Sequence, residues 1–130
     1  MSLLAVIDRM GASWTGDAGS FDDLLADDVV IEVPFAAGGA RRWVGREEWL
    51  AFARPARAAF PVRFDRFTKL AVHETADPEV AVVEYELAGE IAATGKRGSA
   101  RFIGVLRVRD GRIAEWREYQ DTAAIQQALG

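Results

Sequence analysis

Apolar residues near the start of the chain recur at helical spacing. They follow one another in steps of three or four residues and form one stripe, made of Leu3, Ile7, Met10 and Trp14. This spacing predicts an amphipathic helix that ends at "TGD" (15–17). Ser20 precedes "FDDLLADD", so we expect it to be the N-cap of a short second helix. The stretch "GREEWLAFARPARAAF" (45–60) predicts a third helix, which Pro55 should kink or divide.

Strand-like alternation replaces the helical pattern over the rest of the chain. "VVIEVPF" (29–35) predicts a short strand that turns Glu32 outward and four apolar residues inward, namely Val29, Ile31, Val33 and Phe35. The following glycine-rich loop, "AAGGARR", contains Arg41 and Arg42 beside the expected mouth of a cavity. Three longer strand-like stretches come next: "VRFDRFTKLAVHET", "EVAVVEYELAGEIAAT" and "GSARFIGVLRVRDGRIAEWREYQD". Helices followed by antiparallel strands predict one α+β domain over residues 1–130, with its sheet curved around the helices.

The two faces of the strand at 99–109 differ in character. One row is uninterruptedly apolar and consists of Ala100, Phe102, Gly104, Leu106 and Val108. This row should therefore face the helices. The opposite row mixes arginines with Ile103 and Val105, which suits a partner surface better than bare solvent. We expect a homodimer that forms through this outer face of the sheet.

The last strand directs an acid toward the apolar interior. In "AEWREYQD" (114–121), alternation places Trp116 and Glu118 on the inward row. Burying a lone carboxylate is costly, so we expect the interior at this point to be a ligand pocket. Tyr85 also points inward, from "VEYEL". Arg66 lies on the row of Val62 and Phe64, where it either pairs with Glu118 in the cavity or reaches the rim.

Composition narrows the possible chemistry. A formal net charge of -4 argues against nucleic acid as a partner, and no run of apolar residues is long enough to span a membrane. The N-terminus has no signal-peptide pattern, so we expect a cytoplasmic protein. The chain has no cysteine and one histidine, His73, which excludes disulfides, thiol nucleophiles and a histidine-rich zinc site. We therefore expect neither a metal nor another cofactor.

Several linked motifs resemble one known superfamily. "WTGD" (14–17), "FDDLLADDVVIEVPF", "GREE" and "DGRIAEWREYQD" are similar to the nuclear transport factor 2-like proteins, and within them to the SnoaL-like group of polyketide cyclases. The resemblance covers essentially the whole chain. It implies a cone-shaped domain with one deep apolar pocket. The superfamily includes ketosteroid isomerase, limonene-epoxide hydrolase, polyketide cyclases and non-catalytic binding modules, so the pocket residues must decide the function.

Two of these activities fit the residues poorly. The resemblance to ketosteroid isomerase implies a shuttle aspartate where this chain has Val33, and two hydrogen-bond donors near Met10 and Gly104. All three side chains are inert, so we exclude that activity. The terminal strand of limonene-epoxide hydrolase resembles "WREY" in this chain. By that resemblance, Glu118 occupies the position of the aspartate that activates water in that enzyme. The Arg and Asp of its middle strand, however, are replaced here by Tyr85 and Leu87.

A cyclase of the SnoaL type fits better, because one buried carboxylate acting as base can suffice for it. The resemblance thus predicts Glu118 and Tyr85 as catalytic residues and a small hydrophobic carbonyl compound as substrate. The expected ligand-binding residues are Trp14, Trp116, Arg66, Phe102, Met10 and Val33. Three alternatives stay open: a module that binds a hydrophobic molecule without converting it, a dimerisation domain with a residual cavity and, less favoured, an activation of water like that of the epoxide hydrolase. Asp121 is expected to cap the final helix, "TAAIQQAL".

Overall fold

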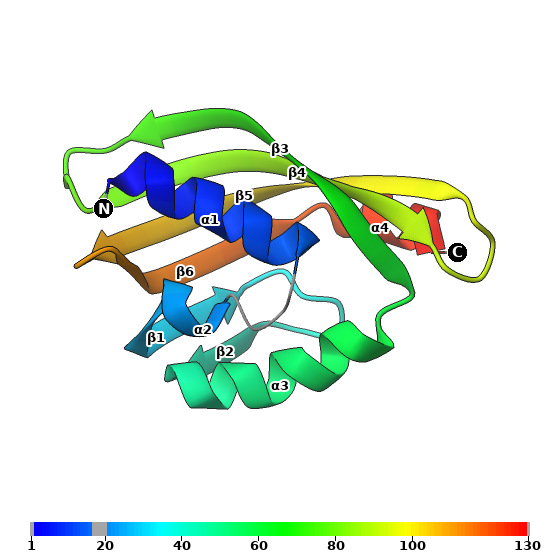
Figure 1. Cartoon of the computed structure of the whole chain (residues 1–130), viewed down its shortest axis with the longest axis horizontal. Helices are drawn as coiled ribbons and strands as arrows, with labels where there is room; N and C mark the ends of the chain where they lie inside the picture. The colour runs from blue at the N-terminus through cyan, green and yellow to red at the C-terminus, as the bar shows by residue number, and fades with distance from the viewer. Residues whose placement is uncertain (1, 17–20, 130) are drawn as a thin grey trace.

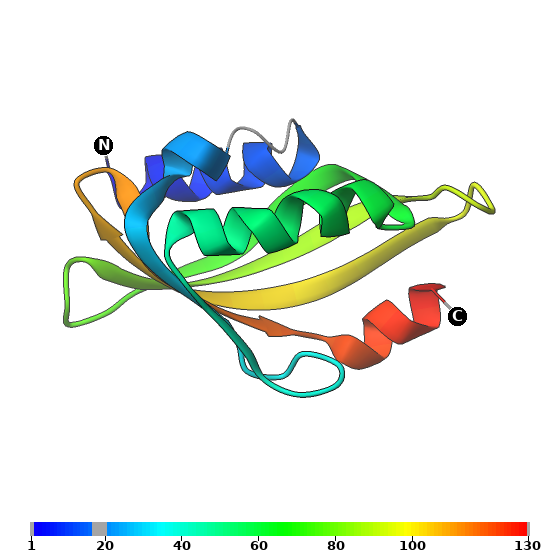
Figure 2. The same cartoon turned by 90° about the horizontal axis from the view of Figure 1, so that it is seen from below.

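A curved six-stranded sheet carries the first three helices on its concave face, and the last helix follows β6 and packs beside β5 (Figures 1 and 2). This computed structural model describes residues 2–16 and 21–129. Its elements are α1 (Leu3–Thr15), α2 (Phe21–Leu24), β1 (Leu25–Val33), β2 (Arg41–Val44), α3 (Arg46–Ala59), β3 (Val62–Glu74), β4 (Val80–Ile91), β5 (Arg97–Arg109), β6 (Arg112–Gln120) and α4 (Thr122–Leu129). The α+β prediction is confirmed.

The sheet is mixed, because its last strand, β6, lies between β1 and β5 and pairs with β1 in parallel. The strand order is β2-β1-β6-β5-β4-β3, and β1 runs parallel to β6 while all other neighbours are antiparallel. The parallel pair joins the β1–β2 hairpin to the β3–β5 meander. Every inward row of the sheet can therefore contribute to one continuous core beneath the helices.

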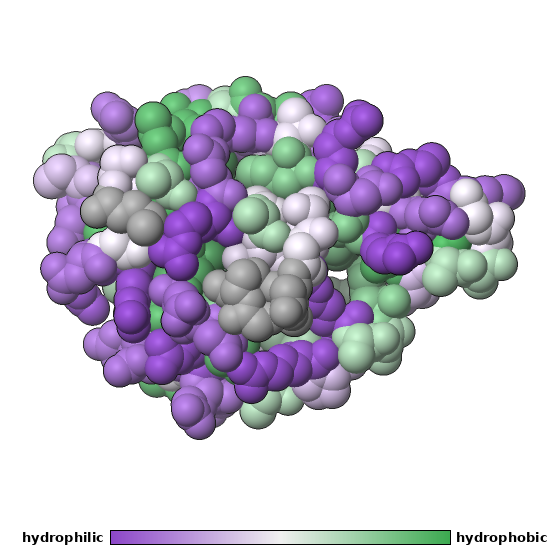
Figure 3. All heavy atoms as spheres, in the orientation of Figure 1, coloured by the Kyte–Doolittle hydropathy of each residue, from purple (hydrophilic) through white to green (hydrophobic). Residues whose placement is uncertain are grey.

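The predicted inward rows of β4, β5 and β6 are confirmed. Tyr85, Leu106 and Trp116 are almost completely buried, whereas Ile103 on the opposite row of β5 is 42% exposed. The apolar stripe of α1 packs onto the inward face through Ile7 and Met10, which have no exposed surface. Seen from the side of α1 and α3, hydrophilic and apolar residues are interspersed on the surface (Figure 3).

Strand β3 departs from the predicted alternation. Its ladder with β4 shifts register between Phe64 and Arg66 and again between Lys69 and Ala71. Each bulge adds a residue and reverses which side chains point inward. Phe67 therefore follows Phe64 on the inner face, and Arg66 is exposed. The expectation that Arg66 enters the cavity is wrong for this reason.

Four further expectations need correction. The helix α2 is a single turn and β1 begins at Leu25, earlier than the apolar run suggested. The supposed loop at 36–42 ends in the edge strand β2. Phe35, which follows Pro34, is 64% exposed and packs against Tyr119 on the outer face. Helix α3 continues through Pro55 without division, because Ala51 is exposed and water can satisfy the carbonyl that Pro55 leaves without a donor.

Capping residues act at both ends of the chain. The Ser2 side chain accepts a hydrogen bond from the Ala5 amide, and the Asp121 side chain accepts one from Ala124, which confirms Asp121 as the N-cap of α4. The predicted cap Ser20 lies outside the described residues. Among the helices that the structure describes, none is both long and apolar enough to cross a membrane.

Candidate functional site

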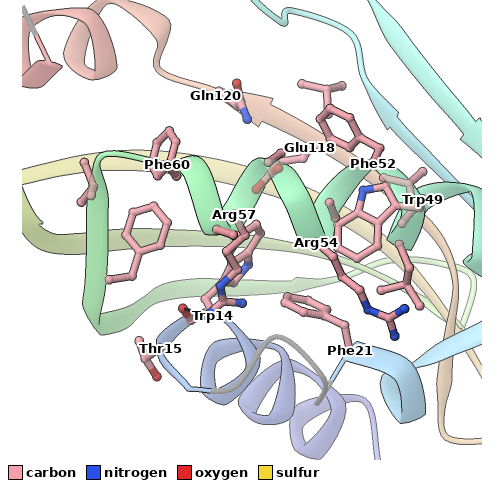
Figure 4. A pocket seen from close by; sticks show the side chains of 18 of the residues that line it. Trp14, Thr15, Phe21, Trp49, Phe52, Arg54, Arg57, Phe60, Glu118 and Gln120 are labelled. Atoms are coloured by element: carbon pink, nitrogen blue, oxygen red, sulfur yellow. Dashed lines mark hydrogen bonds between the residues drawn. The ribbon is translucent and has the colours of Figure 1, made fainter.

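A large cavity lies between α3 and the concave face of the sheet (Figure 4). Its volume is about 940 Å³, and residues from α1, α2, α3, β1, β2, β3, β4 and β6 line it. The wall is rich in aromatic rings: Trp14, Phe21, Trp43, Trp49, Phe52, Phe60, Phe64 and Trp116. These include all four tryptophans of the chain. A cavity of this size and lining suits a small apolar or aromatic molecule.

Glu118 projects from β6 into this aromatic cavity and is only 6% exposed. The Tyr85 hydroxyl donates a hydrogen bond to Oε1 of Glu118. Tyr85 belongs to β4, and it reaches Glu118 across Gly104 of β5, which is paired with Glu118 in the ladder. A Cβ atom at Gly104 would lie 3.5 Å from the Tyr85 ring, which is an ordinary van der Waals distance. The two side chains form one buried pair.

The environment brings the pKa of Glu118 close to neutrality. Burial raises the pKa of the Glu118 carboxyl to about 7, although hydrogen bonds from Tyr85 and Gln120 partly oppose this rise. Burial also raises the pKa of Tyr85 well above its usual value, and the negative charge of Glu118 adds to the rise. Tyr85 therefore stays protonated and acts as a donor. Glu118 can exchange a proton near pH 7, as a general base requires.

The predicted site residues fall into three groups in the structure. Glu118, Trp14, Trp116 and Val33 line the cavity. Tyr85, Met10 and Phe102 are buried behind its wall and are not among the lining residues. Tyr85 is enclosed because its ring stacks between Phe67 and Phe102, with ring centroids 5.1 and 5.4 Å away. Arg66, in the third group, lies outside the cavity.

Other lining residues were not singled out from the sequence. Gln120 also lines the cavity, and it stands two residues after Glu118, so strand alternation alone could have indicated it. The contributions from α3 carried no comparable signal. Arg57 of α3 lines the cavity and donates to the carbonyl oxygens of Ser13 and Trp14 at 2.6 Å. It thereby fastens α3 to the C-terminal end of α1 beside the cavity.

Some of the charged residues that line the cavity have an acid or a base beside them. Arg54 makes two hydrogen bonds to the Asp22 carboxylate, at 2.6 and 2.8 Å. Arg63 lies opposite Glu90 in the β3–β4 ladder, and both residues line the cavity. Over residues 2–16 and 21–129, no group of three or more His, Asp or Glu side chains is placed to hold a metal ion.

The chain is similar in sequence to one protein family and to a bacterial protein. The family described as SnoaL-like domain matches residues 6–116, a span that ends two residues before Glu118. An uncharacterised PhzA/B-like protein of Pseudomonas aeruginosa is 36% identical over 117 residues, which cover 88% of this chain and 80% of the relative.

Solved structures agree in fold. A Bacillus subtilis protein called a "Putative Isomerase" has a TM-score of 0.85 at 24% identity, over 98% of this chain and 91% of the other. A "Putative SnoaL-like polyketide cyclase" from Jannaschia sp. CCS1 has a TM-score of 0.73 at 17% identity, over 97% of this chain and 90% of the other. At such identities the likeness concerns the fold alone.

Proposed function

This chain belongs to the SnoaL-like family, and from that premise we propose that it is a cofactor-independent enzyme of the cyclase or isomerase type. Its reaction is the transfer of a proton at the carbon beside a carbonyl group of a small apolar substrate. The observation that carries this proposal is the single buried carboxylate, Glu118, in an aromatic cavity. A fold built only for stability gains nothing from such a placement, because desolvating a carboxylate costs free energy.

The proposed reaction begins with Glu118 as the base. Tyr85 donates to Oε1 of Glu118, and in this proposal Oε2 takes the proton from the substrate carbon. The electron pair of the broken C–H bond moves into the carbonyl group and forms an enolate. In an isomerase, protonated Glu118 returns the proton to another carbon. In a cyclase, the enolate carbon attacks a second carbonyl group, and the resulting alkoxide takes up the proton.

Two neighbours assist the base in this proposal. Tyr85 is a positioning residue, since it holds Glu118 from behind the cavity wall and does not reach the substrate. Gln120 lies in the cavity wall on the same strand, and in this proposal its amide group, which also hydrogen-bonds Glu118, donates to the enolate oxygen. Preformed donors of this kind stabilise the charge that develops in the transition state.

The direct test is exchange of carbon-bound hydrogen for deuterium. Cyclic and open-chain 1,3-dicarbonyl compounds are incubated with the protein in D2O, and the exchange is followed by NMR. We expect the wild-type protein to accelerate exchange in at least one compound and Glu118→Gln to abolish the acceleration. Glu90→Gln, which changes another carboxylate lining the same cavity, is the matched control and should retain it. Equal exchange by wild type and Glu118→Gln would contradict the assignment of the base.

A non-catalytic binding module is the second candidate. It is favoured by the enclosure of Tyr85, which leaves Glu118 and Gln120 as the polar groups of this part of the wall. A bound ligand would then raise the melting temperature without being converted. Epoxide hydrolysis is less favoured, because Leu87 is buried and apolar where that chemistry requires a second acid.

We further propose that two copies of the chain associate through the outer face of the sheet. This face exposes Ile103 (42%) and Phe35 (64%), and Val105 of β5 is half-buried between neighbouring strands. Apolar side chains grouped on one strand face are typical of surfaces that bind a partner. The arrangement would leave the cavity on the opposite face free in both copies.

A further inference from the structure

We infer that the substrate carries a carboxylate or a similar anionic group, and that Arg41 binds this group at the mouth of the cavity. The inference rests on the proposed function of the site, since it names the class of molecule that Glu118 would act on. It depends on three features of Arg41: the face of the edge strand β2 from which it projects, the aromatic rings that its guanidinium group contacts, and the lack of an acidic partner among the described residues.

Strand alternation turns Arg41 toward the cavity. Arg41 and Trp43 are two residues apart on β2, so their side chains lie on the same face. Trp43 is buried in the cavity wall, and both residues line the cavity. Arg42, between them, points to the outer face and pairs with Glu32 at 3.7 Å. The two neighbouring arginines thus face opposite sides of the sheet.

Aromatic rings hold the Arg41 guanidinium in place. Its central carbon lies 5.1 Å from the ring centroid of Trp43 and 4.5 Å from that of Phe52. A guanidinium group that contacts rings through its flat face keeps the N–H donors at its edge available. These donors match the two oxygens of a carboxylate, which they can bind in a bidentate manner.

The charge of Arg41 is not matched by an acid of the described chain. Its partner in the β1–β2 ladder is Val33, and no ion pair joins it to a described Asp or Glu. The other arginines of the wall differ. Arg54 pairs with Asp22, and Arg57 donates to backbone carbonyl oxygens. Arg63 has Glu90 as its cross-strand neighbour in the β3–β4 ladder. An exposed arginine at a cavity mouth, with ordered rings behind it and no acid beside it, is suited to an anion from solution.

Arg41 and Glu118 lie on the same side of three adjacent strands. Arg41 of β2 pairs with Val33 of β1, and the parallel ladder of β1 with β6 reaches Glu32 and Arg117, each one residue before Val33 and Glu118. Neighbouring strands are about 4.8 Å apart, so the two backbones are separated by roughly 10 Å. One compact molecule can therefore present its anionic group to Arg41 and its acidic C–H group to Glu118.

The test measures the preference of the cavity for charge. The probes are 3-phenylpropionate and its neutral counterpart 3-phenylpropanamide, which differ only in the group that Arg41 would contact. Binding is followed by tryptophan fluorescence, because every tryptophan of the chain lines the cavity. The wild-type protein should bind the carboxylate at least tenfold more tightly than the amide. Arg41→Gln should reduce this preference to less than twofold without weakening amide binding.

Arg42→Gln is the matched control, because it removes the same charge one residue away on the outer face, and it should keep the full preference. Circular dichroism checks that each variant is folded. Arg41→Lys keeps the charge without the planar edge and should show an intermediate preference. A wild-type protein that does not prefer the carboxylate, or an Arg41→Gln variant that still does, overturns the inference.

The outcome is independent of catalysis. Glu118→Gln should keep the preference for the carboxylate while abolishing deuterium exchange. A wild-type protein that shows no charge preference but does accelerate exchange would therefore refute the role of Arg41 alone. An intact preference without exchange would refute the proposed reaction alone.

Discussion

Tyr85 and Glu118 are buried side by side and control one another's protonation. The Tyr85 hydrogen bond is one of the two contacts that hold the pKa of Glu118 down against the effect of burial. The residues that stack on Tyr85 keep it from the cavity, so its influence on a reaction must pass through Glu118. Its removal should therefore change the pH dependence of the reaction more than the binding of the substrate.

Tyr85→Phe tests this coupling. Loss of the donor should raise the pKa of Glu118 above about 7 and shift the rising limb of the pH–rate profile for deuterium exchange to higher pH. Affinity for a neutral ligand should change less than twofold. Tyr119→Phe is the control, since Tyr119 packs against Phe35 on the outer face. An unshifted profile in Tyr85→Phe would contradict the positioning role.

Glu118 should also make the stability of the protein depend on pH. Its pKa is raised from 4.5 to about 7 on folding, so between these values the folded state binds the proton more tightly than the unfolded state. The contribution to stability is complete below pH 4.5 and is lost as the pH rises to about 7. The loss is about 3 kcal/mol at most, by linkage. Urea unfolding of wild type and Glu118→Gln measures it, and only the wild type should show the decline.

The sequence predicted Glu118, Trp14, Trp116 and Val33 in the cavity wall, but not the residues that α3 contributes. Glu118 was identifiable because alternation in "AEWREYQD" is regular and β6 is a central strand without bulges around this residue. Arg41 could be placed near the cavity mouth. Its stacking on Phe52, however, depends on how α3 packs against β2, and no local pattern encodes that contact.

Individual elements were predictable to the extent that their side chains alternate regularly. The faces of β4 and β5 followed from sequence, whereas β3 contains two bulges that reverse its alternation. A bulge depends on the partner strand as much as on its own residues, and it therefore escapes a reading of one strand alone. The short strand β2 was missed because it follows a glycine-rich loop and its four residues are too few to show a clear alternation of apolar and polar side chains.

Gly89 makes one of these bulges possible. It pairs with Phe64, and a Cβ atom at Gly89 would lie 2.2 Å from the backbone carbonyl oxygen of Arg63. Backbone cannot rotate away as a side chain can, so Gly89→Ala should lower the free energy of unfolding by about 2 kcal/mol. Gly104→Ala is the control on the same sheet, because its nearest contact would be 3.4 Å. Urea denaturation should show a larger loss of unfolding free energy in Gly89→Ala than in Gly104→Ala. Equal losses in the two variants would contradict the role of Gly89 in the bulge.

At the scale of the whole molecule, the two faces of the sheet have different proposed tasks. The concave face holds the cavity, and the outer face is proposed to bind a second copy. Ile103→Asp places a charge at the exposed centre of that face and should convert a dimer into a monomer. Light scattering after size-exclusion chromatography measures the mass. A wild-type protein that elutes as a monomer at high concentration would contradict the proposed dimer.

The position of β6 has a consequence for how the molecule is made. A ribosome synthesises this strand after every other strand, yet the finished sheet needs it between β1 and β5. Until residues 112–120 have emerged, the β1–β2 hairpin and the β3–β5 meander share no strand that could hold them together. Nascent chains therefore expose apolar surface to chaperones until this strand has emerged, and the acid arrives with the strand that completes the sheet.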